Sequence, residues 1–254
     1  MEYKPANNSY SNYEKHIHNE TKKNISEMNF MQNIDIMGVF GVDNNWGHEY
    51  SNLIKKEFPD FVNIVKKGLL DNKLKLFNSL GSPNLYYCSV FERNISANCA
   101  RYIYHALIIQ TYIYKKYEDT SIDIVEIGGG YGGLAYWLNV LNKNINKYSI
   151  CDLDVITQFQ KKCLDYYEVK CDFITNPYSF LKSDKPLFCI SNYGFSEFNN
   201  YFQEIYTEYI TSKADSGFMI WNNWTGIFPF TNNTMIKEKE RPEFPDIHNL
   251  FIYF

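Results

Sequence analysis

Hydrophobic positions divide the chain into an N-terminal part with helical spacing and a later part in which short apolar runs alternate with helices. Residues 1–45 are polar and show little periodicity, which suggests a loose leader that either packs on another part of the protein or stays mobile. Across residues 49–70 apolar side chains recur every three or four positions, and Pro59 divides this stretch into two helices. A longer helix with a broad apolar face is predicted over 96–117, with Ser96 as its N-cap.

From residue 122 onward, apolar runs alternate with helical patterns. The runs lack polar positions, as expected for strands that helices cover on both faces, and their spacing indicates βαβ units and a mostly parallel sheet. The stretch 222–249 has three prolines and no clear strand, so a sixth strand is not expected before the last one. The predicted strands cover 122–127, 148–151, 169–174, 186–191, 217–221 and 250–254, and the predicted helices among them cover 133–141, 154–166 and 196–211.

These elements predict an α/β fold with a Rossmann-like core. The length of 254 residues suits one such core together with a helical extension. We therefore expect a polar leader and helical region over 1–95 and the core over 96–254.

Charge and cysteine usage exclude several classes of function. With 25 basic and 29 acidic residues and no long basic run, the chain does not have the composition of a nucleic-acid-binding protein. Its apolar runs are shorter than the span of about 18 residues that a membrane helix needs, so a cytoplasmic protein without a membrane span is expected. Six cysteines without a CxxC pair predict buried thiols in a reducing compartment. Because no two aspartates are adjacent, we expect no metal site.

A glycine-rich turn joins the strand at 122–127 to the next helix, with the sequence Gly-Gly-Gly-Tyr-Gly-Gly. Glycines let the chain turn sharply and bring backbone N–H groups close to a ligand, and the following helix offers its N-terminus to an anion. Gly133 completes a dinucleotide-like Gly-x-Gly-x-x-Gly spacing, so the glycines alone also permit NAD. The cofactor contacts predicted in this loop are Gly128, Gly130, Tyr131 and Gly132.

Acidic residues at the strand ends distinguish between these cofactors. Glu126 precedes the first glycine of the loop by two positions, where it suits a cationic amine and would repel a pyrophosphate. S-adenosylmethionine carries an amino group and a sulfonium and no phosphate, so Glu126 favours it. Asp152, at the end of the second strand, can accept hydrogen bonds from both ribose hydroxyls. Asp172 in the third strand is a candidate at the adenine edge, or else a solvent-facing charge.

Three segments together resemble the sugar O-methyltransferases, a branch of the class I S-adenosylmethionine-dependent methyltransferases. They are residues 125–135, 148–153 and 190–197, and the resemblance extends over roughly residues 95 to 222. It implies a class I methyltransferase core and cofactor contacts at Glu126, Gly128, Gly130, Gly132 and Asp152. It further implies that Ser191 and Asn192 face the methyl group, with Ser196 and Glu197 close by. The absence of a proline after Leu153 and the short tail depart from the family pattern.

Methyl transfer to a hydroxyl needs an acceptor oxygen held against the methyl group and a base for its proton. Glu197 is the candidate base, although it also suits the first turn of a helix. Asn192 could orient the acceptor or the cofactor. His105 and His248 are further candidates, although a histidine on an aromatic helix face is more often structural. The residues of 221–224, Trp-Asn-Asn-Trp, suit either a sugar ring or a buried aromatic turn.

The sequence thus favours an S-adenosylmethionine-dependent methyltransferase that acts on a sugar hydroxyl of a glycan or nucleotide-sugar. Two alternatives stay open. A nicotinamide-dependent oxidoreductase would share the glycine spacing, and a non-catalytic scaffold or partner subunit would keep the fold without its chemistry.

Overall fold

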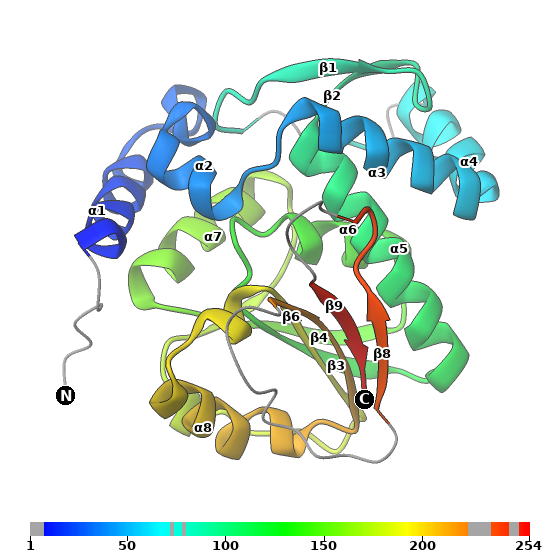
Figure 1. Ribbon diagram of the computed structural model, residues 1–254. Helices are drawn as coiled ribbons and strands as arrows, with labels where there is room; N and C mark the ends of the chain where they lie inside the picture. Colours follow the sequence, from blue (N-terminus) through cyan, green and yellow to red (C-terminus); the bar gives the residue numbers. More distant parts are fainter. Residues whose placement is uncertain (1–7, 72–73, 78–79, 223–234, 244–248) are drawn as a thin grey trace. The chain divides into compact units, whose positions relative to one another are not determined.

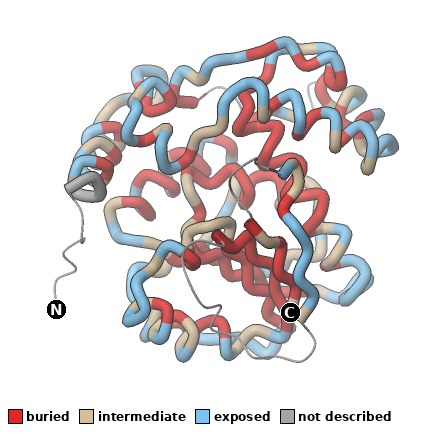
Figure 2. Tube along the Cα trace, viewed as in Figure 1, coloured by how far each residue is buried: buried red, intermediate tan, exposed pale blue. Residues whose placement is uncertain are grey.

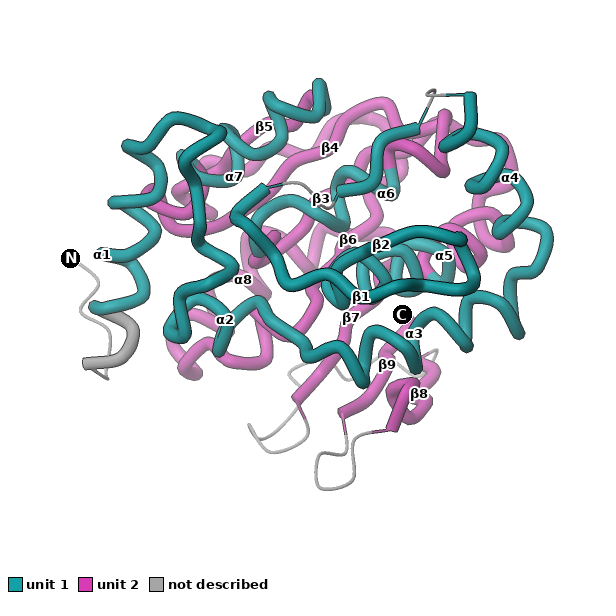
Figure 3. The backbone as a smooth tube through the Cα atoms, turned by 90° about the horizontal axis from the view of Figure 1, so that it is seen from above, with its two compact units in different colours: residues 1–108, 130–138, 158–169 teal, residues 109–129, 139–157, 170–254 magenta. Residues whose placement is uncertain are grey.

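The computed structural model describes residues 8–71, 74–77, 80–222, 235–243 and 249–254. The chain divides into two compact units, which Figure 3 shows in different colours. Unit 1 comprises residues 1–108, 130–138 and 158–169, and unit 2 comprises residues 109–129, 139–157 and 170–254. Three of the five boundaries fall inside helices, and each unit is described by itself below. The predicted division near residue 95 stays a prediction.

Unit 1 is built mainly from helices. Its elements are α1 (Asn8–Lys22), η1 (Ile25–Glu27), η2 (Phe30–Gln32), α2 (Ile34–Phe40), α3 (Asn44–Glu57), α4 (Pro59–Leu70), a hairpin of β1 (Leu85–Cys88) and β2 (Arg93–Ser96), and the first half of α5 (Ala97–Tyr117). Pro59 begins α4, and the Ser96 hydroxyl accepts a hydrogen bond from the Cys99 amide, so both predicted helix starts are confirmed.

The polar leader, whose order the sequence leaves open, contains helices from residue 8 onward. Helices α1 and α2 form there because local caps and buried apolar side chains stabilise them. The Asn33 side chain accepts from the amides of Asp35 and Ile36 at the start of α2. Ile17 of α1 and Ile36 of α2 are fully buried. One apolar position per turn is enough to pack a short helix, but it is too sparse to read as a periodic pattern.

Unit 2 contains a seven-stranded sheet in the order β5-β4-β3-β6-β7-β9-β8. Figure 1 labels β3, β4, β6, β8 and β9 of this sheet. Strands β3, β4, β5, β6 and β7 are parallel, β9 is antiparallel to β7, and β8 is antiparallel to β9. Numbered within the sheet in chain order, the strands lie 3-2-1-4-5-7-6, with the last strand reversed. The strands are β3 (Ile122–Ile127), β4 (Ile145–Cys151), β5 (Asp172–Ile174), β6 (Leu187–Asn192), β7 (Ser216–Trp221), β8 (Ile236–Lys239) and β9 (Leu250–Tyr253). The remaining elements of unit 2 are η3 (Pro177–Ser179), η4 (Gly194–Glu197), α8 (Asn200–Tyr209) and η5 (Thr211–Lys213). Helices α6 (Gly133–Leu141) and α7 (Asp154–Tyr166) are divided between the two units.

The central strands are buried on both faces, as their continuous apolar runs predict (Figure 2). On one face, Tyr206 and Ile210, at the end of α8, join the core with Val125 and Met219 of the strands. On the other face, Tyr112, in the part of α5 that belongs to unit 2, packs its ring against Phe188 and Tyr253, at centroid distances of 5.9 and 5.0 Å. Two covered faces stabilise a sheet of this parallel kind.

Two expectations about the later elements are corrected. A sixth strand does exist: β8 is exposed along its whole length and is held by pairing with β9, so it shows no apolar pattern. The helix predicted from Ser196 is instead the short η4 followed by α8, whose cap is Asn199, because the Asn199 side chain accepts from the Phe202 amide.

This strand order, with its reversed last strand, is the class I methyltransferase arrangement of a Rossmann-like α/β core, preceded in the chain by helices. The expected fold class is therefore confirmed, in a form with the full seven strands. Among the described helices, none is long and apolar enough to cross a bilayer.

Candidate active site

The carboxyl ends of β3, β4 and β6 lie side by side in unit 2. Glu126 of β3 is opposite Ile150 of β4 on one side and Ile190 of β6 on the other. The chain then leaves each strand within a few residues, at Gly128, Asp152 and Tyr193. In open α/β sheets ligands bind beyond these strand ends. The predicted site residues Glu126, Asp152 and Asn192 thus belong to one edge.

Glu126 is the most deeply buried acidic group at this edge. Its side chain is 1% exposed, and its Oε2 accepts a hydrogen bond of 2.7 Å from the Tyr148 hydroxyl. Burial raises the pKa of the Glu126 carboxyl to about 7, the Tyr148 hydrogen bond opposes the rise, and the charge of Asp152 adds to it. Near neutral pH this carboxyl therefore exchanges between its two forms, and a cation placed beside it would favour the ionised one.

Two glycines bring the β3 and β6 exits into backbone contact. Gly128 has a φ of 74°, which disfavours L side chains, and a Cβ there would lie 3.3 Å from the Gly194 Cα. Ser191 ties the two strands together, because its Oγ donates to the Ile127 carbonyl (2.8 Å) and accepts from the Phe195 amide (3.0 Å). Ser191 thus has a structural role, and the β3 exit presents backbone without side chains.

The exit from β6 is strained. Tyr193 follows Asn192 with φ 68° and ψ −43°, a conformation that costs a residue with a side chain about 1–3 kcal/mol. Its amide donates to the Ile220 carbonyl (2.9 Å), and its carbonyl accepts from the amide (3.0 Å) and hydroxyl (2.6 Å) of Ser196. Strain held by several hydrogen bonds often marks a functional site.

Glu197 and Asn222 meet at this same exit. The Asn222 Nδ2 donates to Glu197 Oε1 at 2.8 Å, and the Asn222 amide donates to the Ser196 Oγ at 3.2 Å. Neighbouring atoms desolvate the Glu197 carboxyl and raise its pKa, while the hydrogen bond from Asn222 opposes the rise. A carboxyl held in this way is suited to take up a proton.

Two residues of this region carry no sequence signal at all. Glu240 follows β8 and is 2% exposed; its Oε1 accepts from the Tyr193 hydroxyl, and its Oε2 accepts from the Asn249 Nδ2 at 2.7 Å. Asn249 is the residue before β9. The Tyr193–Glu240 contact joins residues 47 positions apart, which no local pattern can reveal.

The two predicted aspartates occupy different places. Asp152 directly follows β4 and is half-buried; its Oδ1 accepts from the amide of Leu153. Asp172 instead begins β5, opposite Ser149, and forms an ion pair of 2.9 Å with Lys147. The Asp172 side chain is 62% exposed. The structure therefore favours the solvent-facing alternative for Asp172, and it is Ile174 that ends β5.

The second half of the glycine loop belongs to unit 1. Gly130 and Gly132 have φ values of 57° and 94°, and the Gln160 side chain donates to the Gly130 carbonyl at 3.0 Å. Tyr131 is 3% exposed and is stacked on Phe77, at a centroid distance of 5.3 Å. The Tyr131 ring thus packs in an aromatic core, which leaves its backbone as the group available to a ligand.

His105 is also buried in unit 1. It is 1% exposed and packs edge-on against the Tyr50 ring at 5.5 Å. Burial and then the nearby Arg101 charge hold the His105 pKa well below its usual value. A neutral histidine among aromatic rings favours the structural alternative over catalysis.

Trp221 and Asn222 are 2% and 5% exposed, and the Trp221 ring packs edge-on against Phe195 at 5.9 Å. The buried-turn alternative is therefore favoured for these two positions. Asn223, Trp224 and His248 lie outside the described residues.

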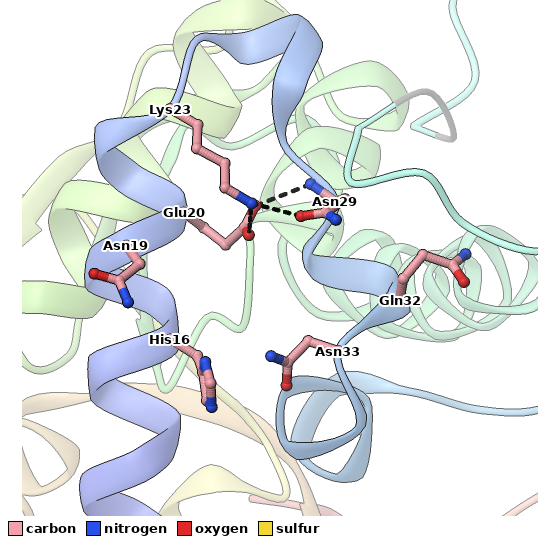
Figure 4. Close-up of a pocket in the computed structure, with 7 residues that line it drawn as sticks. All are labelled: His16, Asn19, Glu20, Lys23, Asn29, Gln32 and Asn33. Atoms are coloured by element: carbon pink, nitrogen blue, oxygen red, sulfur yellow. Dashed lines mark hydrogen bonds and ion pairs between the residues drawn. The ribbon is translucent and has the colours of Figure 1, made fainter.

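A polar hollow of about 390 Å³ lies in unit 1 between α1 and the segment that leads into α2 (Figure 4). One of its lining residues is a buried carboxylate, Glu20, which accepts from Lys23 Nζ at 2.5 Å and from the Asn29 amide at 2.9 Å. The Lys23 Nζ also donates to Asn29 Oδ1 at 2.6 Å. These groups satisfy one another and hold the end of α1 to the following turn. Over the described ranges, no three His, Cys, Asp or Glu side chains gather as a metal site would require.

No family model and no curated protein matches the sequence. Solved structures of methyltransferases are similar to part of the chain. One is an S-adenosylmethionine-dependent methyltransferase from Aquifex aeolicus, with 9% identity over 57% of this chain and 87% of that one and a TM-score of 0.39. Another is magnesium protoporphyrin IX methyltransferase from Synechocystis with bound S-adenosylmethionine, with 10% identity over 61% and 80% of the two chains and a TM-score of 0.42.

The 23S rRNA methyltransferase ErmE is similar at 9% identity, over 57% of this chain and 65% of its own, with a TM-score of 0.38. Two of these neighbours are named for different substrates, a porphyrin and a ribosomal RNA, and likeness at this level says nothing about cofactor or substrate. What the strand order of unit 2 establishes is the fold of the class I S-adenosylmethionine-dependent methyltransferases.

Proposed function

We propose that this chain is an S-adenosylmethionine-dependent methyltransferase that transfers the methyl group to a sugar hydroxyl. The observation that carries the cofactor assignment is the buried Glu126 carboxyl beside the side-chain-free turn at Gly128. A carboxyl with a pKa of about 7 at this position is suited to receive a cationic amine. A pyrophosphate there would face a charge of its own sign, which speaks against NAD.

The chain's own groups fit the parts of S-adenosylmethionine. Glu126 would hold the amino group, Asp152 would accept from the ribose hydroxyls, and backbone amides of Gly128 and its neighbours would approach the ligand closely. We propose Gly130, Tyr131 and Gly132 as further contacts through their backbone. The bound cofactor would supply an electrophilic methyl group.

Support for a hydroxyl acceptor comes from the β6 exit. Asn192 ends this strand, and the Glu197 carboxyl is held there by Asn222. We propose that Asn192 orients the acceptor and that Glu197 is one candidate for its proton. The sugar class follows from the sequence resemblance, and a small-molecule or glycan acceptor fits the charge balance of the chain better than a nucleic acid.

Isothermal titration calorimetry with S-adenosylmethionine, S-adenosylhomocysteine and NAD tests the cofactor. We expect the first two to bind and NAD not to bind. Transfer of a labelled methyl group to UDP-glucose, GDP-mannose and free glycosides then tests the acceptor class. Absence of binding by both methyl cofactors would refute the proposal, NAD binding would favour an oxidoreductase, and tight binding without transfer to any hydroxyl would favour a scaffold.

A further inference from the structure

Tyr193 lies at the exit of β6, in a backbone position that packing alone does not explain. The residue lies between Asn192, which ends β6, and Gly194, whose Cα approaches Gly128. Its positive φ is unfavourable for a tyrosine, and the adjacent Gly194 could adopt such a φ more easily. The strained position therefore puts a tyrosine side chain where the chain passes closest to the glycine turn.

The contacts of Tyr193 lead to one buried carboxylate. Its backbone is held by Ile220 and Ser196, and its hydroxyl donates to Glu240 Oε1. Glu240 also accepts from the Asn249 side chain at 2.7 Å, and its amide donates to the Asn249 carbonyl at 2.9 Å. Two donors on its two oxygens suit an ionised carboxylate, which can only accept hydrogen bonds.

The phenol oxygen keeps accepting capacity while it donates to Glu240. A half-buried tyrosine can therefore accept a hydrogen bond from a ligand hydroxyl on one side and donate to a buried carboxylate on the other. The Tyr193 hydroxyl thus connects the β6 exit to a carboxylate that is out of contact with water.

We propose that Tyr193 and Glu240 take the proton of the acceptor hydroxyl during methyl transfer. The inference rests on the proposed function and names its proton path. The acceptor O–H bond breaks as its proton moves to the Tyr193 oxygen, and the phenolic proton moves to Glu240 Oε1. An electron pair of the acceptor oxygen forms the new O–CH₃ bond, while the pair of the S–CH₃ bond stays on sulfur and S-adenosylhomocysteine is released.

A carboxylate is basic enough for this step. The acceptor hydroxyl is a weak acid at first, but its O–H group becomes strongly acidic as the methyl group bonds to the oxygen. Transfer to Glu240 is therefore favourable late in the reaction, and a stronger base is unnecessary. Glu197 is the rival proton acceptor at the same exit. Its Oε1 accepts a hydrogen bond from the Asn222 side-chain amide, and an amide has no acidic proton to pass on as a phenol does.

Fluorine NMR of protein labelled with 3-fluorotyrosine tests the path without turnover. The resonance that is missing in Tyr193→Phe identifies this residue among the 22 tyrosines. We expect it to shift in Glu240→Gln and on addition of S-adenosylhomocysteine. The resonance of Tyr178, an exposed residue of η3, is the control and should not move in Glu240→Gln. The inference would be overturned by a Tyr193 resonance that is unchanged in Glu240→Gln, or that is unchanged in wild-type protein shown to bind S-adenosylhomocysteine.

Turnover gives the second arm, with labelled S-adenosylmethionine and the sugar acceptors named above. Tyr193→Phe and Glu240→Gln should each lower kcat about 100-fold and leave the KM for S-adenosylmethionine within about twofold. The double variant should be no worse than either single one, because both residues serve one path. A large loss in Glu197→Gln with little loss in Tyr193→Phe would assign the proton to Glu197 instead.

The two proposals fail in different ways. If the wild type binds no S-adenosylhomocysteine, the proposed function fails and the proton path with it, even where Glu240→Gln still shifts the Tyr193 resonance. If the wild type binds the cofactor but Tyr193 does not respond, only the proton path fails. Should Glu240→Gln not fold by circular dichroism, Tyr193→Phe, which keeps the ring, decides alone through its kcat.

Discussion

Replacement of Glu126 by glutamine should make the protein more stable at alkaline pH. The pKa of this carboxyl rises from 4.5 to about 7 on folding, because the side chain is buried. Between these values the folded state binds a proton that the unfolded state does not, so the free energy of unfolding falls as pH rises through this window and levels off above it. The rise corresponds to about 3 kcal/mol, since each pKa unit is worth about 1.4 kcal/mol.

Glutamine has no charge to desolvate, and its oxygen can still accept from the Tyr148 hydroxyl. At pH 8 the Glu126→Gln variant should therefore unfold with a free energy up to about 3 kcal/mol higher than the wild type. At pH 4.5 the two should be equal. For a protein of this length the gain corresponds to a rise in Tm of about 6–12 °C.

Urea unfolding and thermal melts at pH 4.5, 6 and 8 measure the effect. Asp172→Asn is the matched control, because its exposed carboxyl forms only a surface ion pair with Lys147 and should change stability by less than about 1 kcal/mol. A Glu126→Gln variant that is no more stable than the wild type at pH 8 would refute the reasoning. The same variant should bind S-adenosylhomocysteine more weakly, because it lacks the carboxylate proposed to hold the amino group. The Glu126 carboxyl would therefore strengthen ligand binding while it lowers the stability of the folded protein.

Three further expectations concern other parts of the chain. Asp152→Ala should weaken S-adenosylhomocysteine binding about tenfold by calorimetry, the loss expected for ribose hydrogen bonds to a carboxylate, and an unchanged affinity would contradict its role. Gly217→Ala should lower the free energy of unfolding by about 1–3 kcal/mol, because a Cβ there meets the Phe254 ring, whereas Gly38→Ala, with open space around it, should be neutral or slightly stabilising. Burial raises the pKa of the half-buried Cys171 thiol to about 12, so at pH 8 it should react with a disulfide reagent roughly a thousandfold more slowly than a model thiol, and fast labelling would count against this environment.

The sequence predicted the parts of the fold that depend on local pattern. The run at β3, the glycine turn and the helix α6 follow one another without interruption, and their bounds agree with the prediction. Continuous apolar strands and periodic helices carry this information in neighbouring positions. Glu126 and Asp152 could be placed for the same reason, because Glu126 is the second-last residue of a strand with a clear pattern and Asp152 directly follows another.

Elements with a weak local pattern were missed. The exposed strand β8 reads Ile-Lys-Glu-Lys, which a loop could equally contain, and only pairing with β9 makes it a strand. For Asp172 the prediction placed the start of the strand too early. The strand was predicted from Val169, but β5 begins three residues later, so Asp172 lies at the start of the strand and not at its carboxyl edge.

By itself the sequence determined the α/β class, the glycine turn and the acidic strand ends, since these arise from residues close together in the chain. Only the tertiary structure decided which distant groups meet. The contact of Tyr193 with Glu240, the close approach of Gly128 and Gly194, and the reversed strand β9 all join segments that the order of strands in the sheet brings side by side. Such contacts depend on how the whole sheet packs, and packing is a property of surfaces that no single segment contains.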